Sequence, residues 1–333
     1  MANGTGWQSA IKFWGDNPEK EADLFEKMKD EIQRVVEGFK DDNQGTRRRP
    51  QHAKMIAGIK NAEFRMSSNI PEDLRVGFLK PSMVYRTYVR FSSAHGTIKS
   101  DSKRDLRGVA IRVKADQPDY HDFLMTNAER HHAKDASEAM ATAVELSKGV
   151  LAGFPGLVKR VGTVSAFRIL LTVILQMVRP IKSIAAETYW SRAPLAIGDV
   201  AVKYLLKPVS QKSKPARSKD KLGEELKHRI ERSEIRFEFQ VQRYIDEHQT
   251  PLENATRKWA SQVETIAELV IPQDAEVVIP DYDLHKDDKG FFEDLEFNPW
   301  HVNTDEFKPI GSMNRFRRVV YPESVKARKQ GSA

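Results

Sequence analysis

The sequence contains no cysteine, and this absence excludes several kinds of chemistry at once. A chain without thiols forms no disulfides and has no thiolate metal ligand or cysteine nucleophile. Any metal must therefore be held by His, Tyr, a carboxylate or a prosthetic group. The same absence fits a reducing compartment. The first residues also lack the apolar core and the small-residue cleavage site of a signal peptide, and we expect a cytoplasmic protein.

The motifs of several common enzyme classes are missing as well. The sequence has no phosphate-binding loop, no dinucleotide-binding fingerprint that follows a strand, and no HExxH or GxSxG motif. The charge pattern does not predict nucleic-acid binding, because 54 basic and 47 acidic residues are interspersed along the 333-residue chain. Two basic stretches, residues 47–49 and 212–221, are able to meet an anion, and for the second we favour a solvated loop.

What the sequence does contain predicts one α+β domain. Asn17 and Pro18 are a good start for an amphipathic helix that continues to about residue 39. Short runs of alternating apolar and charged residues follow, and the same texture returns after a helical middle section. These runs are residues 62–66, 84–91, 109–113 and 235–242. We expect them to join one antiparallel sheet or barrel, with residues 1–45 as a helical arm and residues 46–333 as a single domain.

Residues 161–178 form the most apolar stretch of the chain. A membrane span is disfavoured, because Arg168 near the middle would cost about 3 kcal/mol at a bilayer centre. The uninterrupted apolar part is also shorter than the roughly 20 residues needed to cross, so we expect a buried helix. The alternative is peripheral membrane contact through residues 161–182, with Arg168, Arg179 and Lys182 at the lipid headgroups. The apolar layer would then receive Ile169, Leu170, Val173 and Ile174.

Four segments far apart in the chain carry histidine, arginine, asparagine and tyrosine residues in a specific order. They are Arg49-Pro50-Gln51-His52-Ala53-Lys54, Arg90-Phe91-Ser92-Ser93 with the following Asp105-Leu106-Arg107-Gly108-Val109-Ala110-Ile111, Asp122-Phe123-Leu124-Met125-Thr126-Asn127, and Phe297-Asn298-Pro299-Trp300 with Arg317-Arg318-Val319-Val320-Tyr321. In this order they resemble the distal-histidine segment, the RFS segment with its D-x-R-G-x-A signature, the distal-asparagine loop and the proximal R-x-x-x-Y helix of catalases. The short length is more similar to the small bacterial catalase-related proteins.

The resemblance implies a catalase-like antiparallel β-barrel surrounded by helices, with haem b buried between the barrel and the helices. It makes Tyr321 the iron ligand on one face of the haem and His52 the distal histidine on the other. The residues that it places near the haem propionates are Arg49, Arg90 and Arg328.

Elementary chemistry supports the roles of Tyr321 and His52 independently of the resemblance. A tyrosine with an ordinary pKa near ~10 is a poor ligand at neutral pH unless a cation favours its phenolate. Arg317 lies one helical turn earlier and supplies that charge on the same face. A phenolate ligand favours ferric iron. On the other face, His52 is able to take a proton from one peroxide oxygen and return it to the other, and Ser92 would orient its ring.

Three departures from the catalase pattern bear on the substrate. The distal asparagine corresponds to Thr126 by spacing and to Asn127 by residue type, so that both are candidates. His131-His132 replaces a phenylalanine pair, and Gln51 stands before the distal histidine where a small apolar residue is usual. These changes predict a more polar and more open pocket, with weak catalase activity and a preference for organic hydroperoxides.

The predicted function is a haem-dependent peroxidase or catalase-like oxidoreductase that cleaves the O–O bond of hydrogen peroxide or of an organic or lipid hydroperoxide. A fatty-acid hydroperoxide lyase or isomerase with the same site is the close alternative. Alternatives from a different class are a barrel that binds haem or lipid without turnover and a colourless carrier at the membrane surface. We expect no nucleic-acid partner, and the resemblance implies association into a homo-oligomer.

Overall fold

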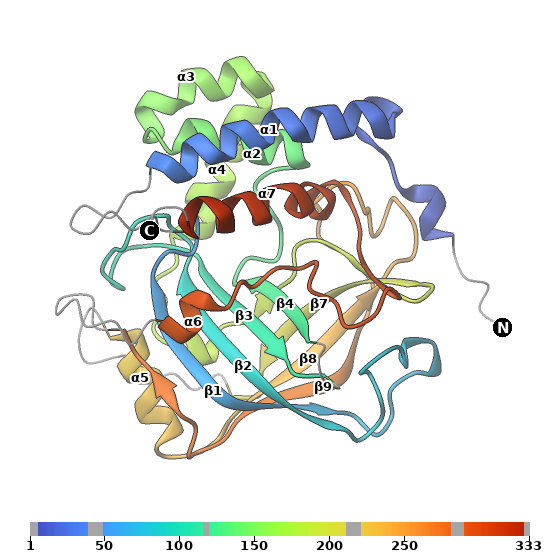
Figure 1. Ribbon diagram of the computed structural model, residues 1–333, viewed down its shortest axis with the longest axis vertical. Coiled ribbons are helices and arrows are strands. Elements are labelled where there is room, and N and C mark those ends of the chain that lie inside the picture. The colour runs from blue at the N-terminus through green and yellow to red at the C-terminus, as the bar shows by residue number, and fades with distance from the viewer. Residues whose placement is uncertain (1–5, 39–48, 116–119, 211–220, 281–289, 330–333) are drawn as a thin grey trace.

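Figure 1 shows the protein as a computed structural model, in which a β-barrel lies beneath a layer of helices. The structure describes residues 6–38, 49–115, 120–210, 221–280 and 290–329. The predicted boundary at residue 45 and most of the two basic stretches lie outside the described residues.

Eight strands close into an antiparallel barrel. Their order is β7-β5-β4-β3-β2-β1-β9-β8, and β8 pairs with β7 to complete the circle. The strands of the barrel are β1 (Met55–Met66), β2 (Val84–Ser93), β3 (Arg107–Val113), β4 (His121–Thr126), β5 (Tyr189–Trp190), β7 (Val200–Pro208), β8 (Ile235–Arg243) and β9 (Val263–Ile271). The short strands β6 (Leu195–Ile197), β10 (Val277–Val278) and β11 (Phe307–Pro309) extend the same sheet. The predicted strands lie in β1, β2, β3 and β8, and the predicted α+β barrel is confirmed.

The interior of the barrel is a filled apolar core. The Phe239 ring lies 5.0 Å from that of Phe64 and 4.8 Å from that of Phe123, measured between centroids, and all three side chains are buried. Side chains alternate between the two faces of a strand, so filling the interior leaves polar side chains on the outside. A binding site for a large flat ligand must therefore lie on the outer face, under the helices.

Most of the helices gather above one side of the barrel (Figure 1). The helices are α1 (Pro18–Gly38), α2 (Ala136–Leu146), α3 (Val150–Val161), α4 (Thr163–Met177), α5 (Leu222–Ile230), α6 (Gly290–Asp294) and α7 (Ser312–Lys329), with short 3-10 turns η1 (Trp7–Ala10), η2 (Trp14–Asp16), η3 (Glu72–Leu74) and η4 (Ile184–Ala186). Of these, α5 lies away from that layer and packs against β1. Phe25 and Met28 of α1 pack with Phe316 and Val320 of α7. The two ends of the described chain therefore lie side by side over the barrel (Figure 1).

The first long helix begins where the sequence predicts. The Asn17 side-chain oxygen accepts hydrogen bonds from the backbone N–H groups of Glu19 and Lys20, at 2.7 and 3.0 Å, and Pro18 has no N–H to satisfy. This cap fixes the direction in which α1 leaves the N-terminal segment.

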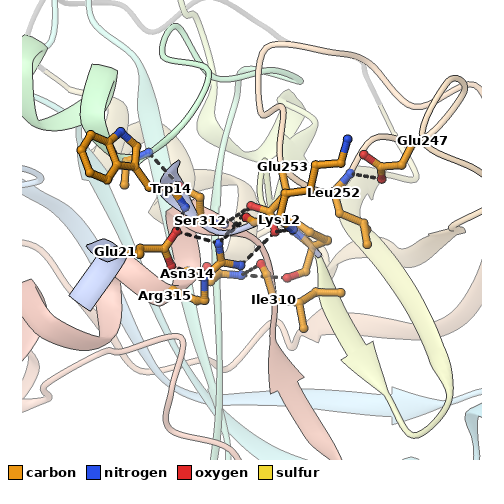
Figure 2. A network of polar contacts seen from close by, with 12 residues as sticks. Lys12, Trp14, Glu21, Glu247, Leu252, Glu253, Ile310, Ser312, Asn314 and Arg315 are labelled. Atoms are coloured by element: carbon orange, nitrogen blue, oxygen red, sulfur yellow. Dashed lines mark hydrogen bonds and ion pairs between the residues drawn. The ribbon is translucent and has the colours of Figure 1, made fainter. Parts of the chain in front are cut away.

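A buried polar network holds the start of α7 in place (Figure 2). The Arg315 guanidinium donates to the Glu21 carboxylate at 2.5 and 3.0 Å, to Glu253 Oε1 at 2.9 Å and to the Lys12 backbone carbonyl at 2.9 Å. Glu253 also accepts from the Ser312 N–H at 2.6 Å. Charge-assisted bonds of this kind are the stronger ones in proteins. The helix that carries Tyr321 is thereby fixed to the N-terminal segment and to the loop before β9.

The apolar stretch of residues 161–178 forms a helix, α4, as expected, but that helix is not buried, and this part of the prediction is wrong. It follows Gly162, with φ +79°, and buries only a narrow face. Val164 is 85% exposed and Phe167 is 58% exposed. Arg168 is paired with Glu138 rather than free to meet lipid, and Ile169 is buried. In the part of the chain that the structure describes, every helix is too short or too polar to cross a membrane.

Candidate active site

A row of four residues crosses the outer face of the barrel at one end. Its members pair across four neighbouring strands in the order Ser92, Gly108, Thr126, Trp190. Phe91, Val109 and Met125, which precede or follow them in sequence, lie in the barrel core. The row therefore points outward, because successive side chains of a strand face opposite ways.

His52 lies on this row, directly over Gly108. A Cβ added at Gly108 would be 2.4 Å from Cε1 and 2.6 Å from Nδ1 of the imidazole, which is closer than real Cβ contacts come. Only glycine at this position leaves room for the ring. The glycine of the D-x-R-G signature therefore has a direct physical reason here, since the imidazole packs against its backbone in the space that a side chain would fill.

Hydrogen bonds fix both the backbone and the ring of His52. Its N–H donates to the Ala94 carbonyl at 3.0 Å, and its carbonyl accepts from Arg90 Nη2 at 3.1 Å. The expected contact with Ser92 is present, with 3.0 Å between Nδ1 and the Ser92 hydroxyl oxygen. His52 also has φ +58°, a left-handed conformation that a side chain other than glycine adopts only where its surroundings require it.

His52 is neutral at physiological pH. Burial lowers the pKa of its imidazole from 6.5 to about 3, and the positive charges of Arg90, Arg192, Arg49 and Arg317 add to the effect. A neutral imidazole has one ring nitrogen free to accept a proton. With Nδ1 at Ser92, the free position for chemistry is Nε2.

The two arginines that the resemblance assigns to haem propionates already hold a carboxylate of the chain itself. Glu293 of α6 accepts from Arg49 Nε at 2.9 Å and from Arg90 Nη2 at 2.8 Å. Burial would raise the pKa of Glu293, but the attraction of Arg90 and Arg49 outweighs it and holds that pKa well below its usual range. The pair is thus suited to carboxylates, and a propionate at this place would share the two arginines with Glu293 or displace it.

The C-terminal helix brings Tyr321 into the same region. Tyr321 is partly buried. Burial lowers the pKa of Arg49, and the Tyr321 phenol is one of the groups that raise it again. Arg317 lowers the pKa of His52 and donates to Asn314 Oδ1 at 3.1 Å. The N-terminal segment with His52 and the C-terminal helix with Tyr321 are therefore within electrostatic reach of each other. Arg328 also belongs to α7, but its side chain is outside the described residues.

The two candidates for the distal asparagine have different partners. The Asn127 side-chain oxygen accepts from the Arg107 N–H at 2.7 Å, and its amide nitrogen donates to Glu187 at 3.1 Å. Thr126 stays on the outward row beside Gly108 and accepts from Arg192 Nη1 at 3.1 Å. The amide of Asn127 is thus engaged in holding strand ends, and Thr126 is the residue of the two that faces the His52 side. The catalytic role of either residue stays a prediction.

A buried cationic group that no sequence motif indicated lies next to Thr126. Arg192 is 7% exposed, and burial followed by repulsion from Arg317 lowers its pKa to about 9. His131 and His132 lie near it with ring centroids 4.2 Å apart, and burial lowers the pKa of His132 to about 3. Arg192 follows a two-residue strand and matches no motif, so nothing in the sequence marked it.

The donor chemistry of this region fits an iron tetrapyrrole with acidic side chains. A phenol on α7 and a neutral imidazole over Gly108 are the two groups required, and buried guanidinium nitrogens without a partner occur at Arg90 and Arg192. Among the described residues, no three His, Asp or Glu side chains are placed to hold a bare metal ion. An iron at this site would therefore come with its own ring of ligands.

No protein-family model and no curated protein matches the sequence. Solved structures do match. A bacterial catalase superposes with a TM-score of 0.63 at 15% identity, covering 85% of this chain and 57% of the catalase. A fungal catalase gives 0.67 at 16% identity, covering 85% and 60%, and catalase A from Saccharomyces cerevisiae gives 0.65 at 13% identity, covering 85% and 61%. The chain thus spans about three fifths of the length of these catalases, and it has the catalase-like fold.

Proposed function

We propose that this protein is a haem-dependent oxidoreductase that cleaves the O–O bond of a peroxide. The observation that carries the proposal is the placement of His52. It is a neutral imidazole resting on Gly108, oriented by Ser92, on the face of the barrel that lies within electrostatic reach of Tyr321. A protein that only stored or carried lipid would have no use for a histidine held in a left-handed conformation with its charge suppressed.

Each residue has a distinct task in this proposal. Tyr321 would ligate the iron, and Arg49, Arg90 and Arg328 would hold the propionates of haem b. When bound, haem would supply the redox-active iron and the electrons that O–O cleavage requires. His52 Nε2 would accept a proton from one oxygen of the peroxide and return it to the other. Ser92 keeps the ring in the tautomer with the proton on Nδ1, and Thr126 or Asn127 polarises the peroxide.

The polar surroundings of His52 favour organic hydroperoxides over hydrogen peroxide. Arg192 donates to Thr126, and His131 and His132 lie near Arg192, so this part of the site is polar, whereas rapid turnover of hydrogen peroxide depends on a tight, apolar channel. The test is the optical spectrum of the purified protein, before and after hydrogen peroxide and cumene hydroperoxide, with turnover of each. We expect a haem band that changes with both and faster turnover of cumene hydroperoxide.

Two outcomes would contradict these proposals separately. Protein that neither contains nor takes up haem, or a haem spectrum that no peroxide changes, would rule out the enzymatic function and favour a binding barrel. Turnover of hydrogen peroxide as fast as that of cumene hydroperoxide would leave the enzyme in place but overturn the substrate preference.

A fatty-acid hydroperoxide lyase or isomerase is the second candidate, and the exposed apolar face of α3 and α4 favours it. That face consists of Val150, Leu151, Val164, Phe167, Leu171, Ile174, Leu175 and Val178. In Figure 1, α3 lies beyond α1 and α2, on the far side from the barrel. The product distinguishes the two functions, because a lyase or isomerase rearranges the hydroperoxide without consuming an electron donor.

We propose that this face lies on a lipid bilayer that contains anionic lipids. Lys159 and Lys182 are exposed at its borders and carry the charge that acidic headgroups attract, whereas Arg160 and Arg179 at the same borders already pair with carboxylates of the chain. Helices with an apolar face and basic borders bind in the plane of the interface rather than across it. The protein would then meet lipid hydroperoxides where they form.

The membrane proposal predicts binding to vesicles. In co-sedimentation we expect binding to phosphatidylcholine vesicles that contain phosphatidylglycerol, and at least about tenfold weaker binding of a variant with Phe167→Ser and Leu171→Ser. Val263→Ser, which changes an exposed apolar side chain on β9, is the matched control and should bind as the wild type does. The face would be a subunit interface instead if the wild type does not bind vesicles but forms homo-oligomers that the double variant does not form.

A further inference from the structure

Arg192 is a buried cation without an anion. Its Nε and Nη2 atoms have no hydrogen-bond partner among the described residues, and Nη1 donates only to a neutral hydroxyl, that of Thr126. The charged group that acts on it most strongly is a second cation, Arg317. A buried charge in this state is costly, and proteins keep such charges paired or use them to bind.

The carboxylates on adjoining segments already have partners. Glu129 pairs with Lys258, Glu138 with Arg168, and Glu187 with Arg179. The other groups near Arg192 are neutral or basic, because burial lowers the pKa values of His131 and His132, and burial, with a smaller contribution from Arg192, lowers the pKa of Lys203. This part of the protein thus has an excess of positive charge and unused donors. A guanidinium with two free nitrogens matches a carboxylate in a bidentate manner.

The position of Arg192 relates this excess of charge to the candidate active site. His52 lies over β3, Arg90 comes from β2, and the Thr126 that Arg192 contacts ends β4. Ser92, which contacts the imidazole, and Thr126 are two strand spacings apart, about 10 Å, with Gly108 and the imidazole between them. Arg192 is also the second most influential charge on the pKa of His52. It faces the same space as His52, from the side opposite the Arg49–Arg90–Glu293 cluster.

We propose that Arg192 binds the carboxylate of the substrate, and that the enzyme acts on carboxylic acids that carry the reactive peroxide within reach of His52. This inference rests on the proposed function and names its substrate class. The carboxylate would take Nε and Nη2, while Thr126 holds Nη1 and fixes the plane of the guanidinium.

The test measures binding without haem and without peroxide, so it can succeed or fail independently of the enzymatic proposal. Laurate, below its micelle concentration, and methyl laurate are titrated into the wild type, Arg192→Met, Arg192→Lys and Arg236→Met. Arg236 lies on β8, opposite β3 across the barrel, and is paired with Glu268, so it is the matched control. We expect laurate to bind at least about tenfold more weakly to Arg192→Met. The loss in Arg192→Lys should be intermediate, because a lysine keeps the positive charge but not the bidentate hydrogen bonding of the guanidinium. Methyl laurate should bind all four proteins alike.

Thermal unfolding of the ligand-free proteins separates a binding arginine from a structural one. Removing an unpaired buried charge should raise the unfolding midpoint of Arg192→Met above that of the wild type, whereas the loss of a structural arginine would lower it. Hemin and its dimethyl ester form the second arm, since a haem propionate is the other carboxylate that could reach Arg192. The proposal is overturned if laurate and its ester bind the wild type equally, if Arg192→Met weakens hemin but not laurate, or if it lowers the midpoint.

Discussion

Tyr321→Phe is expected to lower the haem affinity of the protein by more than about a hundredfold, because losing even an outer partner of a metal ligand costs 10- to 100-fold and this change removes the ligand itself. The fold should survive, since phenylalanine keeps the ring that packs against the apolar cluster between α1, α2 and α7. The measurement is hemin titration of the ligand-free protein, followed by the absorbance of the haem band. Haem that still binds should have a spectrum without phenolate ligation.

The control for this experiment is Tyr244→Phe. Tyr244 also packs partly against an apolar cluster, but that cluster contains Trp7 and Trp259 and lies beside the N-terminal segment rather than beside His52. Equal haem binding by Tyr321→Phe and the wild type would show that the phenol is not the ligand. The interpretation of α7 as the proximal helix would then have to be abandoned, whatever the fold.

The parts of the structure that the sequence predicted are those set by local patterns. The strand β8 could be identified because Phe237, Phe239 and Val241 alternate with polar residues, and a period of two fixes which side faces the core. The start of α1 could be identified because Asn17 and Pro18 satisfy the first N–H groups in a known way. The contact between His52 and Ser92 was expected because both residues lie in segments that resemble a known site.

The parts that were missed depend on neighbours distant in sequence. Glu293 meets Arg49 across 244 residues, and no pattern in either segment marks the pair. Arg192 gains its significance from Thr126 and Arg317, which come from β4 and α7. The apolar stretch of residues 161–178 was taken for a buried helix because its composition is that of a core. Exposure, however, depends on which other elements cover a helix, and α2 covers only one side of the α3–α4 pair.

His52→Gln is expected to leave haem bound but to slow its reaction with peroxides by about 100- to 10,000-fold, the usual share of a general acid and base. Glutamine fills the space over Gly108 without adding bulk and keeps a group that can meet Ser92, but it does not shuttle a proton. Haem content and the rate of the spectral change after a peroxide is added are measured on the same sample. Ser92→Ala, which leaves the imidazole in place without its hydrogen bond, should give a smaller loss of rate with unchanged haem content.

The pH dependence of the reaction rate and of stability tests the role of His52 in a second, independent way. A histidine with an ordinary pKa of 6.5 would lose its base function below that pH, whereas His52, with a pKa of about 3, should keep it, so the rate should stay flat down to about pH 4. The free energy of unfolding, in contrast, should fall on acidification. The unfolded chain binds a proton at this residue below pH 6.5, whereas the folded chain does not until about pH 3. The wild type should therefore lose stability on acidification over that interval more steeply than His52→Gln. A rate that falls with a midpoint near 6.5, or identical stability profiles for the two proteins, would show that the imidazole is not held neutral over Gly108.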